Sequence, residues 1–202
     1  MSALRKWSRR VVTGLRHPTY GVRRLGLLAY ELTHPNEPWI ASGAVRYCEQ
    51  HLPKSARALE WGSGRSTLWF AERVASLTSI EHDSGWFEKM SPRVAQHANV
   101  DYRLITLDHP LTAPTLRTYD PQPRYVGVID DFEDSSLGLV VVDGHYRQAC
   151  VRAAIPKLAR GGLLLIDNWD RTSREEWGVP PELELLHLSS NAMTHTAIWT
   201  KP

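Results

Sequence analysis

The sequence predicts an α/β fold, in which one doubly wound domain with a mostly parallel, seven-stranded sheet follows a helical extension at the N-terminus. Three observations support this. The 202 residues suffice for one full domain with a sizeable core, and the apolar fraction of 42% is ordinary for a globular protein. From about residue 36 onward, segments typical of strands alternate with segments typical of helices, as a parallel sheet covered on both faces requires. A glycine turn at Gly62 and Gly64 follows the first of these strands, where open sheets bind ligands.

The first half of the domain alternates regularly between the two kinds of segment. Short apolar runs bounded by turn residues indicate strands, and longer runs with apolar residues three and four apart indicate helices. Ser66 or Thr67 can cap the helix after the glycine turn. In chain order we expect a helix over residues 40–51, a strand over 57–60, a helix over 66–74, a strand over 77–81, a helix over 86–96 and a strand over 101–106.

The second half begins with an irregular stretch, residues 109–136, which contains four prolines. A connection of this length in a compact domain usually has a function or short structure of its own, and residues 125–129 could form a short strand there. We then expect strands over 137–142 and 162–166 with a helix over 147–158 between them, and a helix over 171–177. The last strands, over 183–188 and 194–200, are joined by a short loop and should pair antiparallel.

Residues 1–36 form a separate, basic arm ahead of the domain at 37–202. Residues 1–30 hold seven of the 24 basic residues and no acid, which leaves 17 basic against 22 acidic residues in the remainder. Apolar residues recur three or four apart in two sets, and each set defines one stripe of an amphipathic helix. These sets are Leu4, Trp7, Val11, Leu15 and Val22, Leu25, Ala29, Leu32.

Two interpretations of the arm remain open. The first is that it packs on its own domain or on a second copy of the chain, and the second is that residues 1–30 contact a membrane surface. The basic residues belong to no recognisable nucleic-acid module, so we expect no nucleic-acid partner. Cys48 and Cys150 lack metal-type spacing, and no apolar run approaches the roughly 18 residues of a membrane span. A cytoplasmic protein is expected, and contact through the arm would place it at the inner face of the membrane.

The glycine turn resembles a nucleotide-binding turn with one difference. Gly62-x-Gly64-x-x-Thr67 lacks the third glycine that dinucleotide folds use to keep helix and strand close beside a pyrophosphate. A ligand without a pyrophosphate is therefore favoured over NAD. Glu81 ends the next strand, 21 residues after Glu60, and an acid at that position can accept hydrogen bonds from a ribose diol. Taken alone, the turn predicts ligand binding and a plain tight turn about equally.

The fuller pattern Glu60-Trp61-Gly62-Ser63-Gly64-Arg65-Ser66-Thr67, with Ser79-Ile80-Glu81-His82-Asp83, resembles the S-adenosylmethionine site of class I methyltransferases, which have a Rossmann-like fold. It is similar to a subgroup that acts on small molecules, and the resemblance covers about residues 38–202. In that family the glycine turn faces the methionine part of the cofactor and the second-strand acid binds the ribose hydroxyls. The resemblance implies these cofactor-binding residues: Glu60, Gly62, Ser63, Gly64, Ser66, Thr67, Glu81, His82 and Asp143.

A second group of polar residues follows two later strands. Asp143 ends the strand over 137–142, and Asp167 and Asn168 end the strand over 162–166, with one helix between. Neighbouring parallel strands place their carboxyl ends at the same edge of a sheet, so these side chains should lie close together. Three oxygen donors in a cleft suit Mg²⁺, although Asp and Asn after a strand also commonly cap the next helix.

Asp143, Asp167 and Asn168 resemble the metal ligands of catechol O-methyltransferase and related cation-dependent enzymes. Where the catechol enzyme has a lysine base, this sequence has Tyr146, preceded by His145. The Asp-Gly-His pattern is closer to bacterial sugar and antibiotic O-methyltransferases, in which a histidine can act as base. The resemblance therefore implies His145, Tyr146 and Asp143 as catalytic residues and a Mg²⁺ ion on Asp143, Asp167 and Asn168. Alternatively, His145 only begins a helix and bonds to the backbone.

Together these features predict an S-adenosylmethionine-dependent methyltransferase that transfers a methyl group to a hydroxyl of a small molecule or glycan, assisted by Mg²⁺. A metal-independent methyltransferase with His145 as base is the first alternative. A non-catalytic binding or scaffold protein with this fold is the alternative from another class. An NAD-type oxidoreductase is disfavoured by the absent third glycine. The sequence does not identify the acceptor.

Overall fold

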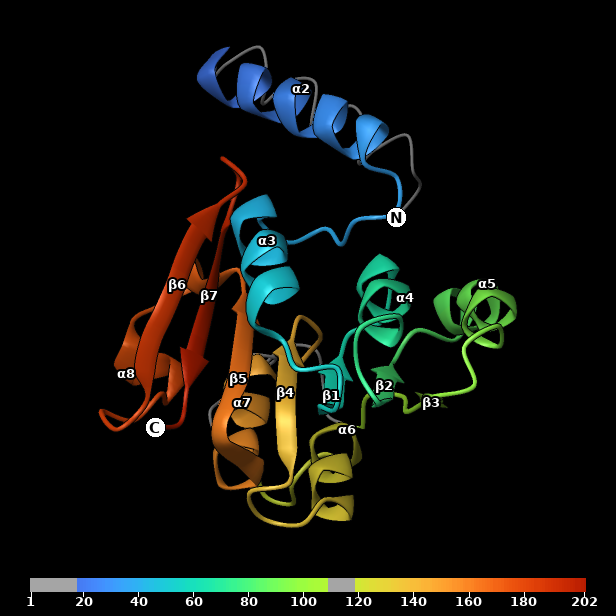
Figure 1. Ribbon diagram of the computed structural model, residues 1–202, viewed down its shortest axis with the longest axis vertical. Coiled ribbons are helices and arrows are strands. Elements are labelled where there is room, and N and C mark those ends of the chain that lie inside the picture. The colour runs from blue at the N-terminus through green and yellow to red at the C-terminus, as the bar shows by residue number, and fades with distance from the viewer. Residues whose placement is uncertain (1–17, 109–118) are drawn as a thin grey trace.

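The computed structural model describes residues 18–108 and 119–202, in which one sheet is sandwiched between two layers of helices (Figure 1). Strands and helices alternate along the chain. The strands are β1 (Arg57–Trp61), β2 (Ser76–Glu81), β3 (Val100–Leu104), β4 (Leu137–Val142), β5 (Leu158–Asp167), β6 (Glu184–Ser190) and β7 (His195–Thr200). The helices are α2 (Pro18–Thr33), α3 (Ser42–His51), α4 (Arg65–Ala71), α5 (Ser84–Val94), α6 (Arg124–Gly127), α7 (Arg147–Lys157) and α8 (Arg174–Trp177), with 3₁₀ turns η1 (Val128–Asp131) and η2 (Trp169–Arg171).

The sheet has seven strands in the order β3-β2-β1-β4-β5-β7-β6. Strands β1 to β5 pair in parallel, whereas β7 is antiparallel to both of its neighbours, so the sheet is mixed. The α/β class and the antiparallel pairing of the last two strands are confirmed. The strand order reverses between β1 and β4, and the carboxyl ends at such a reversal form the crevice in which open sheets bind ligands.

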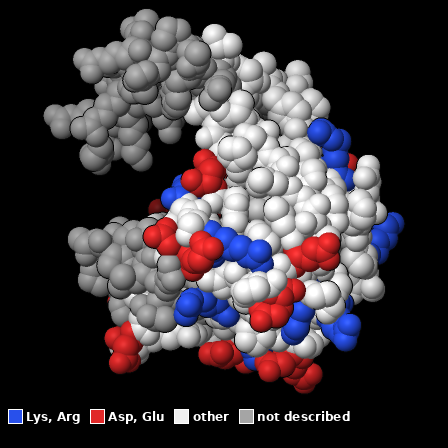
Figure 2. Space-filling model, turned by 90° about the vertical axis from the view of Figure 1, so that its left-hand side faces the viewer, with Lys and Arg blue, Asp and Glu red and all other residues white. Residues whose placement is uncertain are grey.

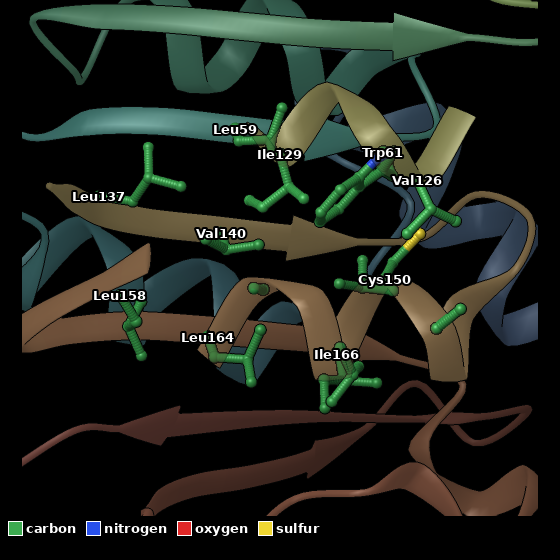
Figure 3. Packing of buried hydrophobic residues seen from close by; sticks show 14 of the residues in the cluster. Leu59, Trp61, Val126, Ile129, Leu137, Val140, Cys150, Leu158, Leu164 and Ile166 are labelled. Carbon is green, nitrogen blue, oxygen red and sulfur yellow. The ribbon is translucent and has the colours of Figure 1, made fainter. Parts of the chain in front are cut away.

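Alternating side chains of the central strands fill two separate apolar cores, one on each face of the sheet. On β4, Val140 and Val142 point to the face covered by α6, α7 and α8, whereas Leu139 and Val141 point to the face covered by α3 and α4. Figure 3 shows the first of these cores, in which Trp61 of β1 lies beside residues of α6. Its indole nitrogen donates a hydrogen bond of 2.8 Å to the carbonyl of Tyr125. This two-sided burial explains why β4 and β5 read as continuous apolar runs.

Some expected elements differ from those observed. The short strand expected over 125–129 is wrong, since these residues form α6 and η1, and Tyr125, Val126 and Ile129 are buried from a helical backbone. A short apolar run does not by itself distinguish a strand from a buried helical turn. The helix expected over 171–177 is divided into η2 and α8, because the Ser173 hydroxyl caps α8 by accepting a hydrogen bond from the Glu176 amide.

Part of the arm forms α2, which stands apart from the sheet in Figure 1. The side chains of Val22, Leu25 and Leu32 are 70%, 67% and 81% exposed, so this stripe does not pack on its own domain within the described residues. The first stripe, from Leu4 to Leu15, lies outside them. Among the described residues, no helix is long and apolar enough to span a membrane. Figure 2 shows one face of the molecule, on which basic and acidic side chains lie interspersed rather than gathered by sign.

Candidate active site

A cavity of about 940 Å³ opens at the carboxyl ends of β1, β2 and β4, where the strand order reverses. This volume is within the usual range for small-molecule sites. Its wall combines segments far apart in the sequence: residues 62–63, 81–83, 86, 143–148, 171–172 and 176–177. Of the residues expected to bind cofactor or act in catalysis, these are found in the wall: Gly62, Ser63, Glu81, His82, Asp143, His145 and Tyr146. Glu60, Gly64, Ser66 and Thr67 are buried close to the turn and outside this wall.

The turn after β1 needs glycine at position 62 for a steric reason. Gly62 has φ of +97°, and a Cβ atom there would lie 2.7 Å from the amide nitrogen of Gly144. The turns after β1 and β4 are therefore in direct backbone contact. Gly64 differs, because its φ of 171° is extended backbone that any residue adopts, and no atom lies within 4 Å of an added Cβ. Only the first glycine of the pair is required by close packing.

Glu60 is fully buried beneath this turn and supports it. Its Oε2 accepts hydrogen bonds of 2.6 Å from the hydroxyls of Thr67 and Ser79, and Thr67 in turn accepts one from the Gly64 amide. Burial raises the pKa of Glu60, against the opposing effect of hydrogen bonds from Ser66, Ser79 and Thr67. Oε1 has no well-directed hydrogen bond within the part of the chain that the structure describes.

Glu81, at the end of β2, presents an ionised carboxylate to the cavity. Its Oε1 accepts hydrogen bonds of 2.8 Å from the amides of His82 and Asp83, and its Oε2 accepts one of 2.6 Å from the Ser63 hydroxyl. Burial opposes ionisation, but the hydrogen bonds from His82, Ser63 and Asp83 outweigh it and lower the pKa of Glu81 to about 2. One lone pair remains on Oε2 and can accept a hydrogen bond from a ligand hydroxyl, such as one of a ribose.

His145 lies in the same wall beside His82, with ring centroids 4.2 Å apart. Burial and the neighbouring His82, Arg147 and Arg171 lower its pKa below the ordinary value of 6.5. His145 is therefore a neutral imidazole at pH 7, the form that accepts a proton. The adjacent Tyr146 is only 1% exposed and its ring packs edge-on against Tyr125.

Arg147, the first residue of α7, joins the carboxyl ends of β4 and β5. Its guanidinium donates to the carbonyls of Gly144, Asp143 and Asp167 at 2.8, 2.6 and 2.6 Å. It also donates to the Asp143 carboxylate at 2.7 Å, which completes an ion pair. Burial raises the pKa of Asp143 to about 7, although the positive charge of Arg147 opposes this. A protein cation is thus already bound where a metal was expected.

The structure confirms that Asp143, Asp167 and Asn168 converge, but it does not support a Mg²⁺ site on them. Besides the pairing of Asp143 with Arg147, the Asp167 carboxylate accepts hydrogen bonds from Thr196 at 2.7 Å and from the Asn168 amide at 2.8 Å. Within residues 18–108 and 119–202, no group of three or more His, Cys, Asp or Glu side chains is arranged to hold a metal ion. A divalent cation would have to displace the guanidinium and break these bonds, so the residues do not fit the metal.

Sequence reasoning missed several residues of this wall, among them the two arginines, Arg147 and Arg171. The i,i+4 spacing of Asp143 and Arg147 would not have predicted their ion pair, because Asp143 lies outside α7, which begins at Arg147. Arg171 belongs to the 3₁₀ turn η2, and no local pattern predicts that it reaches the cavity.

The chain matches no model of a protein family and no curated protein. It is similar in structure to a methyltransferase-like protein from Silicibacter pomeroyi (22% identity, TM-score 0.57, 82% of this chain and 89% of that one). A Corynebacterium glutamicum protein is also similar (17% identity, TM-score 0.56, 88% of this chain and 89% of that one). So is MtNAS in complex with S-adenosylmethionine (10% identity, TM-score 0.50, 78% of this chain and 60% of that one). At these identities the likeness shows the fold, which is the Rossmann-like fold of methyltransferases.

The close approach of the two turns predicts that Gly62 and Gly64 respond differently to alanine. Gly62→Ala should lower the free energy of unfolding by about 2–4 kcal/mol, because it combines strain at positive φ with overlap of backbone atoms. The matched Gly64→Ala should change it by less than about 1 kcal/mol. Urea denaturation of both variants measures this, and equal losses would contradict the contact between the turns.

Proposed function

We propose that this protein is an S-adenosylmethionine-dependent methyltransferase that methylates a hydroxyl of a small molecule or glycan without a divalent cation. The observation that carries this is the ionised Glu81 carboxylate, which lies beside the Gly62 turn in a cavity at the reversal of strand order. The methyltransferase fold supports it, as does the neighbour MtNAS in complex with S-adenosylmethionine.

Several residues of the cavity wall would hold the cofactor. Glu81 would accept hydrogen bonds from the ribose hydroxyls, and the turn at Gly62 and Ser63 would lie against the methionine part. Glu60, buried beneath the turn, would act on the cofactor indirectly, by holding the turn through Thr67 and Ser79. When bound, the cofactor supplies a methyl group on a positively charged sulfur, which is transferred by direct displacement.

The chain's own residues then have two tasks, to orient the acceptor and to remove its proton. A protonated hydroxyl is a poor nucleophile, and neutral His145 can accept the proton as the new bond forms. The proton remains on the imidazole ring until it is released to solvent. Because His82, Arg147 and Arg171 disfavour a charged imidazole, His145 returns readily to its neutral form.

Cofactor binding is tested first by calorimetry. The protein should bind S-adenosylhomocysteine and not NAD, and Glu81→Gln should weaken binding by about tenfold to a hundredfold, because a charged acceptor for the ribose is lost. The exposed Glu133→Gln makes the same chemical change away from the cavity and should leave the affinity unchanged. Absence of S-adenosylhomocysteine binding, or normal binding by Glu81→Gln, would refute the proposed site.

The low pKa of His145 predicts how protonation of the site depends on pH. In an NMR titration of the histidine side chains, with His145→Gln used to assign the signal, His145 should titrate below 6.5. Since the neutral form is the base, methyl transfer should be constant above that pKa and fall as the pH drops through it. A pKa above 7 for His145 would contradict its assignment as base.

Because Arg147 occupies the position expected for a metal, Mg²⁺ should not change the melting temperature of the protein. A ligand that binds the folded state raises the melting temperature, so magnesium chloride and EDTA at equal ionic strength should give the same value within about 1 °C. A rise with Mg²⁺ that disappears in Asp167→Ala would instead support the cation-dependent alternative.

A further inference from the structure

Two arginine side chains line the same part of the cavity from different elements. Arg147 begins α7, and Arg171 ends η2. They are close enough that the positive charge of Arg147 contributes, after burial, to lowering the pKa of Arg171. Arg171 also lines a second cavity of about 500 Å³ next to Asn168 and Trp39, so it stands between two spaces that an acceptor can fill.

Arg147 is fixed and retains one free donor. A guanidinium has five N–H groups. Four of them donate to Gly144, Asp143 and Asp167: one from Nε, one from Nη1 and two from Nη2. One N–H on Nη1 remains, on a side chain that is 14% exposed and faces the cavity.

The charge of Arg171 has no directly paired partner within the part of the chain that the structure describes, although Asp143, Asp167 and Asp170 favour it from nearby. Its guanidinium has no hydrogen bond or ion pair there, because the nearby carboxylates are engaged elsewhere. Asp170 accepts hydrogen bonds from the hydroxyl of Thr194 and the amide of His195. The Asp167 carboxylate accepts hydrogen bonds from Thr196 and Asn168, and the Asp143 carboxylate pairs with Arg147. The turn that carries Arg171 is itself held, since its amide donates to the Asn168 carbonyl at 3.1 Å.

We propose that Arg171, together with the free N–H of Arg147, binds an anionic group of the acceptor, a carboxylate or a phosphate, beside His145. This deepens the proposed function, on which it rests, by naming the substrate class. Guanidinium groups match the planar oxygens of carboxylates and phosphates and form strong, charge-assisted hydrogen bonds with them. An anion here would relieve the repulsion between the two arginines and hold the acceptor hydroxyl near the base.

The test uses the full chain saturated with S-adenosylhomocysteine, with inorganic phosphate and acetate titrated separately at constant ionic strength and followed by calorimetry. The protein should bind at least one of the two anions in the millimolar range, and which one binds distinguishes a phosphate from a carboxylate. Arg171→Met should weaken this binding at least tenfold, and Arg171→Lys should retain part of it. The control is Arg160→Met, which removes the same charge from an exposed position toward the other end of β5 and should have no effect.

Three results would overturn the inference: neither anion binds, Arg171→Met binds as well as the unaltered protein, or Arg160→Met weakens binding equally. The same titrations without S-adenosylhomocysteine separate the two proposals. If S-adenosylhomocysteine does not bind but phosphate or acetate binding depends on Arg171, the proposed function fails while the anion site stands. Circular dichroism of each variant verifies that it is folded.

Discussion

The site depends on the hydrogen bonds of one guanidinium. Parallel strands that end side by side leave carbonyl groups unpaired, and burying such groups without partners is costly. At the ends of β4 and β5, Arg147 satisfies the carbonyls of Asp143, Gly144 and Asp167 together with one carboxylate. The turn that Arg147 holds is the same turn against which Gly62 packs. The Gly62 turn, the end of β4 and the end of β5 are thereby fixed relative to one another.

The same interaction shapes the chemistry of the cavity. A cation that belongs to the protein cannot dissociate. It pairs with Asp143 and, after burial and His82, contributes to the lowered pKa of His145. In the same lining, Glu81 is ionised because His82, Ser63 and the Asp83 amide donate hydrogen bonds to it. The cavity therefore combines the ionised carboxylate of Glu81, the guanidinium groups of Arg147 and Arg171 and the imidazole of His145. Under the proposed function, this would bring the nucleoside of the cofactor and an anionic acceptor into one space. A direct displacement needs this alignment of donor and acceptor more than it needs a metal.

Much of the architecture was predictable from the sequence because it follows from periodicity and from rules of strand connection. The seven strands, the position of the glycine turn, the place of Glu81 and the convergence of Asp143 with Asp167 all follow in this way. What the sequence did not reveal depends on side-chain direction and tertiary contact. The reach of Arg147 across to β5, the path of Arg171 and the helical backbone at Tyr125 are examples. The exposure of Val22 and Leu25 on α2 is another, because an apolar stripe in the sequence does not predict which surface it packs against.

The most direct test is a crystal of the protein grown with S-adenosylhomocysteine and excess Mn²⁺ and examined by anomalous scattering. It shows whether a guanidinium or a metal ion lies between the ends of β4 and β5. Mn²⁺ is a suitable probe because it binds the same oxygen ligands as Mg²⁺. We predict no anomalous peak near Asp143 and Asp167, with Arg147 hydrogen-bonded to the strand ends and the adenosyl group lying against Glu81. A Mn²⁺ peak ligated by Asp143, Asp167 and Asn168, with Arg147 turned away, would contradict this view of the site.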